Sequence, residues 1–519
     1  MPQLLCAFDL GTNGVKAGLF TPEGRMLGQS YQEYGIECPK RGWAEQSIER
    51  MWQAQCNATQ ALLASTGVHP QEIAAIGVSS QRATFAPLDA AGQPLTPFIG
   101  WQDRRSIQEC EWMARTLGTR RYYEIAGLPL EPTAAVSKIL WLKHHNPELY
   151  ERTATFGSTQ NVHLALLGAE NPPCDLADAG YMGLLDVDQL VRSQELLDAL
   201  DLPREKFPKL APSGQVVGAL SAVAAEATGL AVGTPLVLAG GDLQVAGLGM
   251  GVAAPGTVSL GIGSGGGVLI HLERPLRHPG MGLNCQPHAV PGAWEMEGIC
   301  LASGASYKWF RDVLGEPERQ IAAERGCDPY DVLNELAAQS EIGAGGLLFL
   351  PALAGSGAPN WYPQARGMIL GLTLATDRSA LVRALLEGIC MEIRGMLEAA
   401  ARMGTTIDEV RIWGGAAKSP LWNQMAADVY GIPAIRTAIS EAGLAGAAIC
   451  AGVGVGLYQN VHEGVACMIR IGESYEPNPV RHQIYNELYD IYSSAYQALK
   501  DSGVFAQISG FYNPVEQAE

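Results

Sequence analysis

The sequence lacks the cysteine spacing and the apolar runs that several protein classes require. Its eleven cysteines are scattered from Cys6 to Cys467 without a CxxC pair, which argues against a disulfide framework and a zinc site. The nine histidines form no HExxH pair, and we interpret His144 and His145 as a solvated helix end. No apolar run reaches the roughly 18 residues of a membrane span, and the N-terminus carries no basic secretory segment. We therefore expect a cytoplasmic protein.

Positive charge is also scarce. The chain carries 35 basic and 53 acidic residues, which gives a formal net charge of −18 at pH 7. This excess of negative charge disfavours nucleic acid and an anionic membrane surface as partners. An anionic substrate would need local hydrogen-bond donors.

The length and the composition are those of a globular protein with more than one core. The chain has 519 residues, of which 47% are hydrophobic and 17% are charged. One core rarely serves so long a chain, so we expect two α/β domains, at residues 1–250 and 251–519.

The stretch from Leu4 to Phe20 predicts a β-hairpin with a polar, glycine-containing turn. Two apolar runs flank Gly11 to Gly14, and glycine lets the backbone approach a ligand closely. Backbone N–H groups of this turn, with Thr12, Asn13 and Lys16, would hold phosphate oxygens, and Asp9 would reach a hydrated metal cation. An ordinary hairpin turn remains the alternative.

A second stretch of the same kind opens the other half of the chain. Pro255 to Ile270 again predicts a strand, a glycine-rich turn and a strand, about 250 residues after the first hairpin. Two such hairpins, one in each domain, would clamp the phosphates of a nucleotide across a cleft between the domains. A coincidental second hairpin is the alternative.

Polar residues follow the ends of several predicted strands, where α/β sheets collect their ligands. Gln81 and Arg82 follow the strand Ile73 to Ser80, and Trp101 to Arg105 combines an aromatic ring, the carboxylate of Asp103 and guanidinium groups. This mixture suits a ligand rich in hydroxyls. A surface arginine and a structural ion pair of Asp103 are the alternatives.

Asp242 follows the strand Thr234 to Ala239 and two glycines, a place where a carboxylate is accessible to substrate. An N-cap for the next helix is the alternative. Further along, the strand Val410 to Trp413 runs into Gly414 to Lys418, where a flat purine would lie on bare backbone. Ser419 and Pro420 predict the N-cap and first residue of a helix.

In this order the motifs resemble those of the FGGY carbohydrate kinases, over most of the chain. They are Asp9 to Thr12, Gln81-Arg82, Trp101 to Arg105, Gly241-Asp242, Gly261 to Gly265 and Trp413 to Ala416, together with Glu387-Gly388 and Gly443 to Gly446. The resemblance implies an actin-like fold of two duplicated ribonuclease H-like domains with a deep cleft between them. It also implies ATP-dependent phosphorylation of a sugar or polyol hydroxyl with Mg²⁺.

Carried over residue by residue, the resemblance assigns Asp242 as the general base and places Asp9 near Mg²⁺. It places Gln81, Arg82, Trp101, Asp103 and Gln244 on the sugar side. The phosphate contacts are Gly11, Thr12, Asn13 and Lys16 in the first hairpin and Gly261, Gly263 and Ser264 in the second, where Ile262 interrupts the family's pattern. The adenine platform is Gly414, Gly415, Ala416 and Lys418.

The substrate is the least defined part of this prediction. Glycerol kinases usually have Glu after the Gln-Arg pair, where this chain has Ala83, and xylulokinases usually carry Met-His at Gln81-Arg82. Asp242-x-Gln244 and His288 to Gly292 resemble kinases of the autoinducer-2 type. A ketopentose or related linear polyol is our hypothesis.

Two other functional classes stay open. An actin-like ATPase would share the phosphate hairpins but not need the polar cluster from Gln81 to Arg105. A non-catalytic sugar or nucleotide sensor would not need Asp9 and Asp242. The sequence leaves the oligomeric state open, with a homodimer as one expectation.

Overall fold

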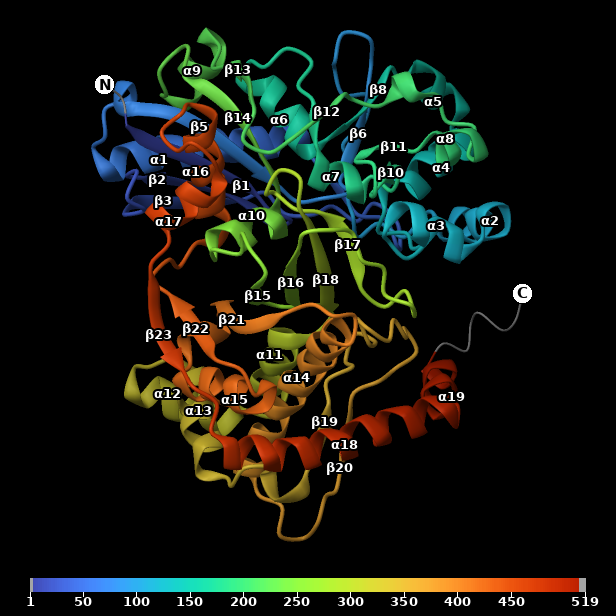
Figure 1. Cartoon of the computed structure of the whole chain (residues 1–519), viewed down its shortest axis with the longest axis vertical. Helices are drawn as coiled ribbons and strands as arrows, with labels where there is room; N and C mark the ends of the chain where they lie inside the picture. Colours follow the sequence, from blue (N-terminus) through green and yellow to red (C-terminus); the bar gives the residue numbers. More distant parts are fainter. Residues whose placement is uncertain (1–2, 513–519) are drawn as a thin grey trace.

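The computed structural model describes residues 3–512, which form two α/β halves stacked along the long axis of the molecule (Figure 1). Each half is built on one large mixed sheet, with strand orders β13-β14-β5-β1-β2-β3 and β17-β18-β16-β15-β21-β22-β23. The shared order, β14-β5-β1-β2-β3 against β22-β21-β15-β16-β18, confirms the duplicated ribonuclease H-like architecture expected from the sequence.

The strands of the first large sheet are β1 (Leu4–Leu10), β2 (Gly14–Phe20), β3 (Met26–Glu33), β5 (Ile73–Ser80), β13 (Val216–Ala219) and β14 (Pro235–Gly241). Those of the second are β15 (Gly256–Ile262), β16 (Gly266–Leu272), β17 (Asn284–Pro287), β18 (Trp294–Cys300), β21 (Ile407–Gly414), β22 (Ala434–Thr437) and β23 (Ile471–Tyr475). The smaller sheets contain β4 (Glu45–Gln46), β6 (Phe85–Leu88), β7 (Phe98–Ile99), β8 (Thr155–Ser158), β9 (Cys174–Asp175), β10 (Leu185–Asp186), β11 (Val191–Arg192), β12 (Leu210–Ala211), β19 (Leu348–Leu350) and β20 (Met368–Leu370).

The helices of the N-terminal half are α1 (Ile48–Thr66), α2 (Ile107–Leu117), α3 (Thr119–Ala126), α4 (Ala135–His145), α5 (Pro147–Arg152), α6 (Thr159–Leu167), α7 (Leu176–Tyr181), α8 (Gln194–Ala199), α9 (Ala222–Thr228) and α10 (Asp242–Gly249). Those that follow are α11 (Ser303–Val313), α12 (Glu316–Arg325), α13 (Pro329–Gln339), α14 (Arg378–Ala401), α15 (Pro420–Tyr430), α16 (Ala442–Gly454), α17 (Val461–Met468), α18 (Pro479–Asp501) and α19 (Val504–Tyr512).

Both predicted hairpins are present in equivalent places. β1 pairs with β2 in antiparallel and with β5 in parallel orientation, and β15 pairs in the same way with β16 and β21. The side chains of Leu5 and Phe8 are fully buried, because both faces of the central strand are covered. The polar turns therefore project from two rigid sheet centres.

Helix boundaries follow the capping residues. Ser419 caps α15 and Pro420 is its first residue, as predicted. The side chain of Asp377 accepts a hydrogen bond from the backbone N–H of Ala380, and α14 begins at Arg378. This helix ends at Ala401, before Gly404.

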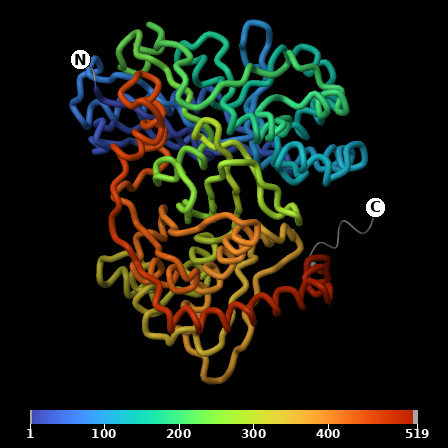
Figure 2. The backbone as a smooth tube through the Cα atoms, viewed as in Figure 1, coloured from blue at the N-terminus to red at the C-terminus, as the bar shows by residue number. Residues whose placement is uncertain are grey.

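The chain returns to the N-terminal half near its end. Apolar residues of α16, among them Leu444 and Ile449, share one core with Leu5, Ala7 and Phe20 of β1 and β2. Figure 2 follows this orange-red segment up to the blue strands and back down to α18. The expected domain boundary at residue 250 therefore stays a prediction. Although α16 follows that boundary in the sequence, it packs on the first sheet, and α17 packs on α16.

Glycine makes the crossing of α10 and α16 possible. A Cβ atom on Gly446 would lie 1.8 Å from the carbonyl oxygen of Val245, and one on Gly249 would lie 1.8 Å from that of Ala442. The two helices therefore pack backbone against backbone. The contact places the C-terminal end of α10 against the start of α16.

Among residues 3–512, no helix combines the length and the apolar character needed to cross a bilayer.

We expect Gly446→Ala to lower the free energy of unfolding by about 1–3 kcal/mol, the usual cost of overpacking a tight contact. Urea unfolding followed by tryptophan fluorescence measures this loss. Gly510→Ala is the matched control, because a Cβ atom on Gly510 meets nothing within 4 Å. Equal stability of the two variants would contradict the close crossing of α10 and α16.

Candidate active site

A cleft of about 810 Å³ lies between the two halves, and many of the predicted site residues line it. The predicted residues on its wall are Asp9, Gly11, Lys16, Arg82, Trp101, Asp242, Gly414, Gly415 and Lys418. They come from the ends of β1, β2, β5, β7 and β21 and from the start of α10. The fold thus brings together residues that lie more than 400 positions apart in the sequence.

Asp242 is the first residue of α10, and Gly241 takes the N-cap position. One carboxylate oxygen, Oδ1, accepts hydrogen bonds from its neighbour Leu243 N at 2.8 Å and from Arg82 Nε at 3.1 Å. The side chain is 37% exposed and lines the cleft. Burial raises the pKa of Asp242, and the Arg82 guanidinium partly offsets this. A carboxylate in this setting can accept a proton from a bound hydroxyl.

Arg82 joins the two halves of the molecule. Its Nη1 lies 2.6 Å from Glu297 Oε2 on β18, while its Nε binds Asp242. The guanidinium carbon lies 3.9 Å from the ring centroid of Tyr181. Two carboxylates and an aromatic face therefore already engage the guanidinium.

Glu295 extends the acidic wall two residues before Glu297, on the same face of β18. Both side chains are fully buried. Glu295 Oε1 accepts a hydrogen bond from Gln244 Nε2 at 2.6 Å, and its Oε2 has no hydrogen-bond partner among the described residues. Burial, followed by the neighbouring Glu297, raises the pKa of Glu295 well above its usual value. Gln244 is itself fully buried, and neither it nor Glu295 lines the cleft.

Asp9 lies at the end of β1 and lines the same cleft. Its Oδ1 is buried without a hydrogen-bond partner in the described part of the chain. Burial and the charge of Asp242 raise the pKa of Asp9 to about 7. A Cβ atom on Gly443, at the start of α16, would lie 2.7 Å from Asp9 Oδ2. Glycine therefore leaves room in front of the carboxylate.

The first hairpin turn presents polar groups beside Asp9. Thr12 Oγ1 accepts a hydrogen bond from Trp101 Nε1 at 3.0 Å, and the exposed Asn13 accepts backbone hydrogen bonds from residues 34 and 35. Lys16 Nζ lies 2.6 Å from Glu441 Oε2, just before α16. The lysine predicted to contact phosphate is thus held in an ion pair with the residue that precedes α16.

The tip of the second hairpin turn is exposed to solvent. Gly263 and Ser264 are exposed, and their carbonyl oxygens accept hydrogen bonds from the backbone of α11. Gly261 is buried against the ring of Trp413, which a Cβ atom would meet at 2.5 Å. Ile262, which interrupts the family's pattern, belongs to the hydrophobic core.

The predicted adenine side follows β21. Gly414 has a φ of +87°, and the backbone N–H of Gly415 donates to the carbonyl of Ile262 at 3.0 Å. Gly414, Gly415 and Lys418 line the cleft, whereas Ala416 is buried behind them. The turn offers a bare backbone surface to a flat ring.

Three residues predicted on the sugar side do not line the cleft: Gln244, described above, Gln81 and Asp103. Gln81 is buried, and its Nε2 donates to Gln46 Oε1 at 2.6 Å. Asp103 is fully buried and accepts hydrogen bonds from Ala44 N at 2.7 Å and from Arg105. Gln81 and Asp103 are therefore buried behind the residues that line the cleft. Their direct contact with a substrate remains a prediction.

Glu295 and Glu297 were not predicted from the sequence as site residues, and Gly443 at the start of α16 was named only as part of a motif. The alternation Trp294-Glu295-Met296-Glu297 is typical of a strand with one solvated face, but here that face meets Arg82 and Gln244. The small residues from Gly443 onward pack closely on α10, and the first turn of α16 also lines the cleft. The strand alternation was the available signal for the glutamates.

Comparisons with known proteins agree with this geometry. Models of the FGGY family of carbohydrate kinases match the chain at residues 4–249, for the N-terminal domain, and at residues 258–455, for the C-terminal domain. An autoinducer-2 kinase of Escherichia coli (strain K12) is 29% identical over 502 residues, which cover 95% of this chain and 94% of that protein.

Solved structures share the fold over nearly the whole chain. The xylulose kinase from Rhodospirillum rubrum superposes with a TM-score of 0.87 at 25% identity and covers 97% of this chain and 100% of its own. A gluconate kinase from Lactobacillus acidophilus also gives a TM-score of 0.87, at 24% identity, with 96% and 98% covered.

The two family matches together span most of the sequence, and the cleft joins the two matched regions. The chain belongs to the FGGY family of carbohydrate kinases and is an enzyme that phosphorylates a sugar or polyol with ATP.

Proposed function

We propose that this kinase phosphorylates one hydroxyl of an uncharged ketopentose or related linear polyol, with Asp242 as the general base. The observation that carries the proposal is the acidic wall around Arg82. Asp242 and Glu297 both bind the guanidinium, and Glu295 lies behind them. Such a wall offers hydrogen bonds to hydroxyl groups.

The charge balance of this wall favours an uncharged substrate. Arg82 is the only cation that contacts Asp242 or Glu297 among the described residues, and both carboxylates already neutralise it. The carboxylate of a sugar acid would face Asp242 and Glu297 without a free cation, and burial strengthens such repulsion. Hydroxyl groups can both donate to the carboxylates and accept from Arg82.

At the reacting hydroxyl, Asp242 acts as the base and Arg82 positions Asp242. Arg82 and the Leu243 N–H hold one oxygen of Asp242. The carboxylate accepts the hydroxyl proton, the hydroxyl oxygen forms the bond to the γ-phosphorus of ATP, and ADP departs. Phosphoryl transfer depends on positioning and charge neutralisation, so one correctly placed base is enough.

The ATP side uses the two turns and the loop after β21. We assign the adenine to the surface of Gly414, Gly415 and Lys418, backed by Ala416. The phosphates would lie between the first turn, at Gly11 to Lys16, and the exposed Gly263 and Ser264 of the second. The first turn of α16 lacks a capping side chain, so its backbone N–H groups are free to bind a phosphate oxygen.

Asp9 fits the role of holding Mg²⁺. Its buried Oδ1 has no partner among the described residues, and Gly443 leaves space before it. Mg²⁺ commonly binds through one or two carboxylates and the substrate's phosphates. Such a cation supplies charge neutralisation for the phosphates when it is bound. The described residues contain no cluster of three or more metal-binding side chains, so Asp9 would share the ion with ATP and water.

Autoinducer-2 is the second candidate substrate, because several relatives at 28–29% identity carry that name. An actin-like ATPase without a sugar substrate gains no support from the acidic wall, which such an enzyme would not need. The expected cytoplasmic location and homodimer remain predictions.

Asp242→Asn should lower kcat by about 10²–10⁴-fold, the usual contribution of a general base, while ATP binding stays unchanged. Steady-state kinetics with a coupled ADP assay and calorimetric titration with ATP measure the two quantities. Asp198→Asn, in the distant helix α8, is the control. A kcat near that of the wild type in Asp242→Asn would remove the assignment of the base.

A substrate panel tests the charge argument. With D-xylulose, D-ribulose, xylitol, autoinducer-2 and D-gluconate, we expect turnover of at least one uncharged compound and none of gluconate above background. Preferred phosphorylation of gluconate would show that the acidic wall does not select against an anion. ATP hydrolysis that none of the compounds stimulates would favour the ATPase alternative.

A further inference from the structure

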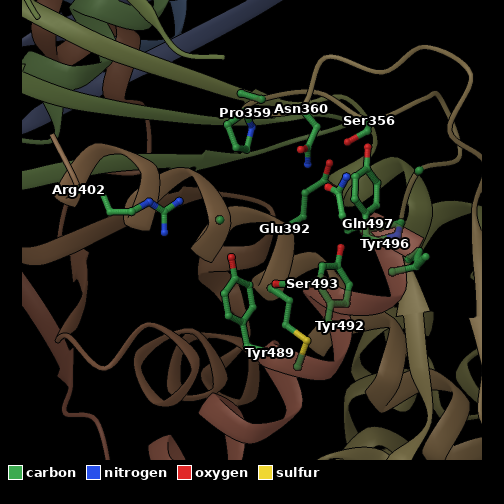
Figure 3. A pocket seen from close by; sticks show the side chains of 16 residues that line it. Ser356, Pro359, Asn360, Glu392, Arg402, Tyr489, Tyr492, Ser493, Tyr496 and Gln497 are labelled. Carbon is green, nitrogen blue, oxygen red and sulfur yellow. The ribbon is translucent and has the colours of Figure 1, made fainter. Parts of the chain in front are cut away.

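A second cavity, of about 180 Å³, lies in the C-terminal half and opens to solvent beside the exposed Asn360, Ser493 and Gln497 (Figure 3). Helix α14 forms one wall, α18 forms another, and residues 350–360 close the top. None of its lining residues also lines the cleft. The family assignment and the proposed reaction therefore leave this cavity without a role.

Glu392 provides the one carboxyl group of this cavity's lining. It extends from α14 toward Asn360 in Figure 3. Its Oε2 accepts a hydrogen bond from the thiol of Cys300 at 2.8 Å, at the end of β18. Burial raises the pKa of Glu392 to about 7. The group can therefore accept a hydrogen bond as a carboxylate or donate one as an acid near neutral pH.

Three tyrosines of α18, Tyr489, Tyr492 and Tyr496, provide the opposite wall. They recur every three or four residues, so they lie on one face of the helix. The hydroxyl of Tyr496 is shielded from solvent and has no hydrogen-bond partner within residues 3–512. Ser493 and Gln497 line the same wall. Ring faces and polar atoms thus alternate along it.

Gly395 keeps the cavity open. A Cβ atom at this position would lie 3.3 Å from the hydroxyl of Tyr489 and 4.0 Å from Pro359 Cδ. A larger side chain would enter the space between α14, α18 and the loop. A glycine inside a helix costs roughly 1 kcal/mol relative to alanine, and here it leaves room beside Glu392.

We propose that this cavity is a second binding site, distinct from the catalytic cleft, for a small uncharged polyhydroxylated molecule. Its polar groups, Glu392, Asn360, Ser493, Gln497 and the Tyr496 hydroxyl, form hydrogen bonds with hydroxyls that both donate and accept. The tyrosine rings cover the carbon skeleton of the ligand. The site is the space between the helices α14 and α18.

The size and the charge of the cavity limit the ligand. An apolar cavity of about 150 Å³ in another protein admits benzene, so 180 Å³ suits a polyol of three to five carbons. Arg402 is the cationic side chain of the lining, and it is 67% exposed and pairs with Glu398. It therefore leaves the interior without a fixed positive charge for an anionic ligand.

Hydrogen exchange measured by mass spectrometry tests this site, with erythritol and xylitol as probes. At ten times its Kd a polyol should slow exchange in peptides covering residues 355–361 and 488–497 by up to about tenfold. Gly395→Leu, which fills the cavity, should abolish this protection and leave unchanged the kcat for the best uncharged substrate of the panel, measured without added erythritol or xylitol. Ser493→Phe fills the cavity from an exposed position on α18. It replaces Gly395→Leu in the experiment if that variant fails to fold, and the same loss of protection is expected.

Gly510→Ala, in the neighbouring helix α19, is the control and should retain the protection. Two outcomes would overturn the proposal. One is the absence of protection in the wild type with both polyols. The other is protection that persists in the cavity-filling variants, which would place the polyol in the catalytic cleft or elsewhere.

Discussion

The ion pairs of Arg82 with Asp242 and Glu297 are the constraint on which the catalytic cleft depends. They connect the residue after β5, the start of α10 and the middle of β18, and so tie the two sheets together. A buried charge is tolerated only when it is paired and hydrogen-bonded. Removing Arg82 would leave the buried carboxylate of Glu297 without its cation. The arrangement therefore fixes the position of the catalytic carboxylate and the chemistry of the substrate wall together.

The duplicated sheets explain why these groups meet. Each sheet places a hairpin turn at its centre, and the two turns approach the cleft from opposite halves. The contact of α10 with α16 holds the start of both helices at the cleft, because glycines allow the backbones to touch. β18 carries Glu295 and Glu297 toward the cleft and ends at Cys300, whose thiol binds Glu392. One strand thus borders both the catalytic cleft and the second cavity.

The sequence predicted the features that local patterns determine. Both hairpins, the strand Ile73–Ser80, the cap at Ser419 and the placement of Asp242 at a strand end followed from glycine spacing, apolar runs and capping residues. It did not predict which face of β18 meets the cleft, because alternating Glu and Met have the same pattern when one face is solvated. Nor did it predict that Gln81 and Asp103 turn inward, since their partners Gln46 and Ala44 come from a segment far earlier in the chain. Local patterns do not contain these tertiary contacts.

A double-mutant cycle on Arg82→Met and Glu297→Gln tests the central claim most directly, because the two residues share a charge pair. The measured quantity is kcat/KM for the best uncharged substrate. The account predicts strong coupling, with the double variant losing about tenfold less activity than the product of the two single losses, which is within the range of interaction energies for residues in contact. Losses that simply multiply would mean that Arg82 and Glu297 act independently, and would contradict the account.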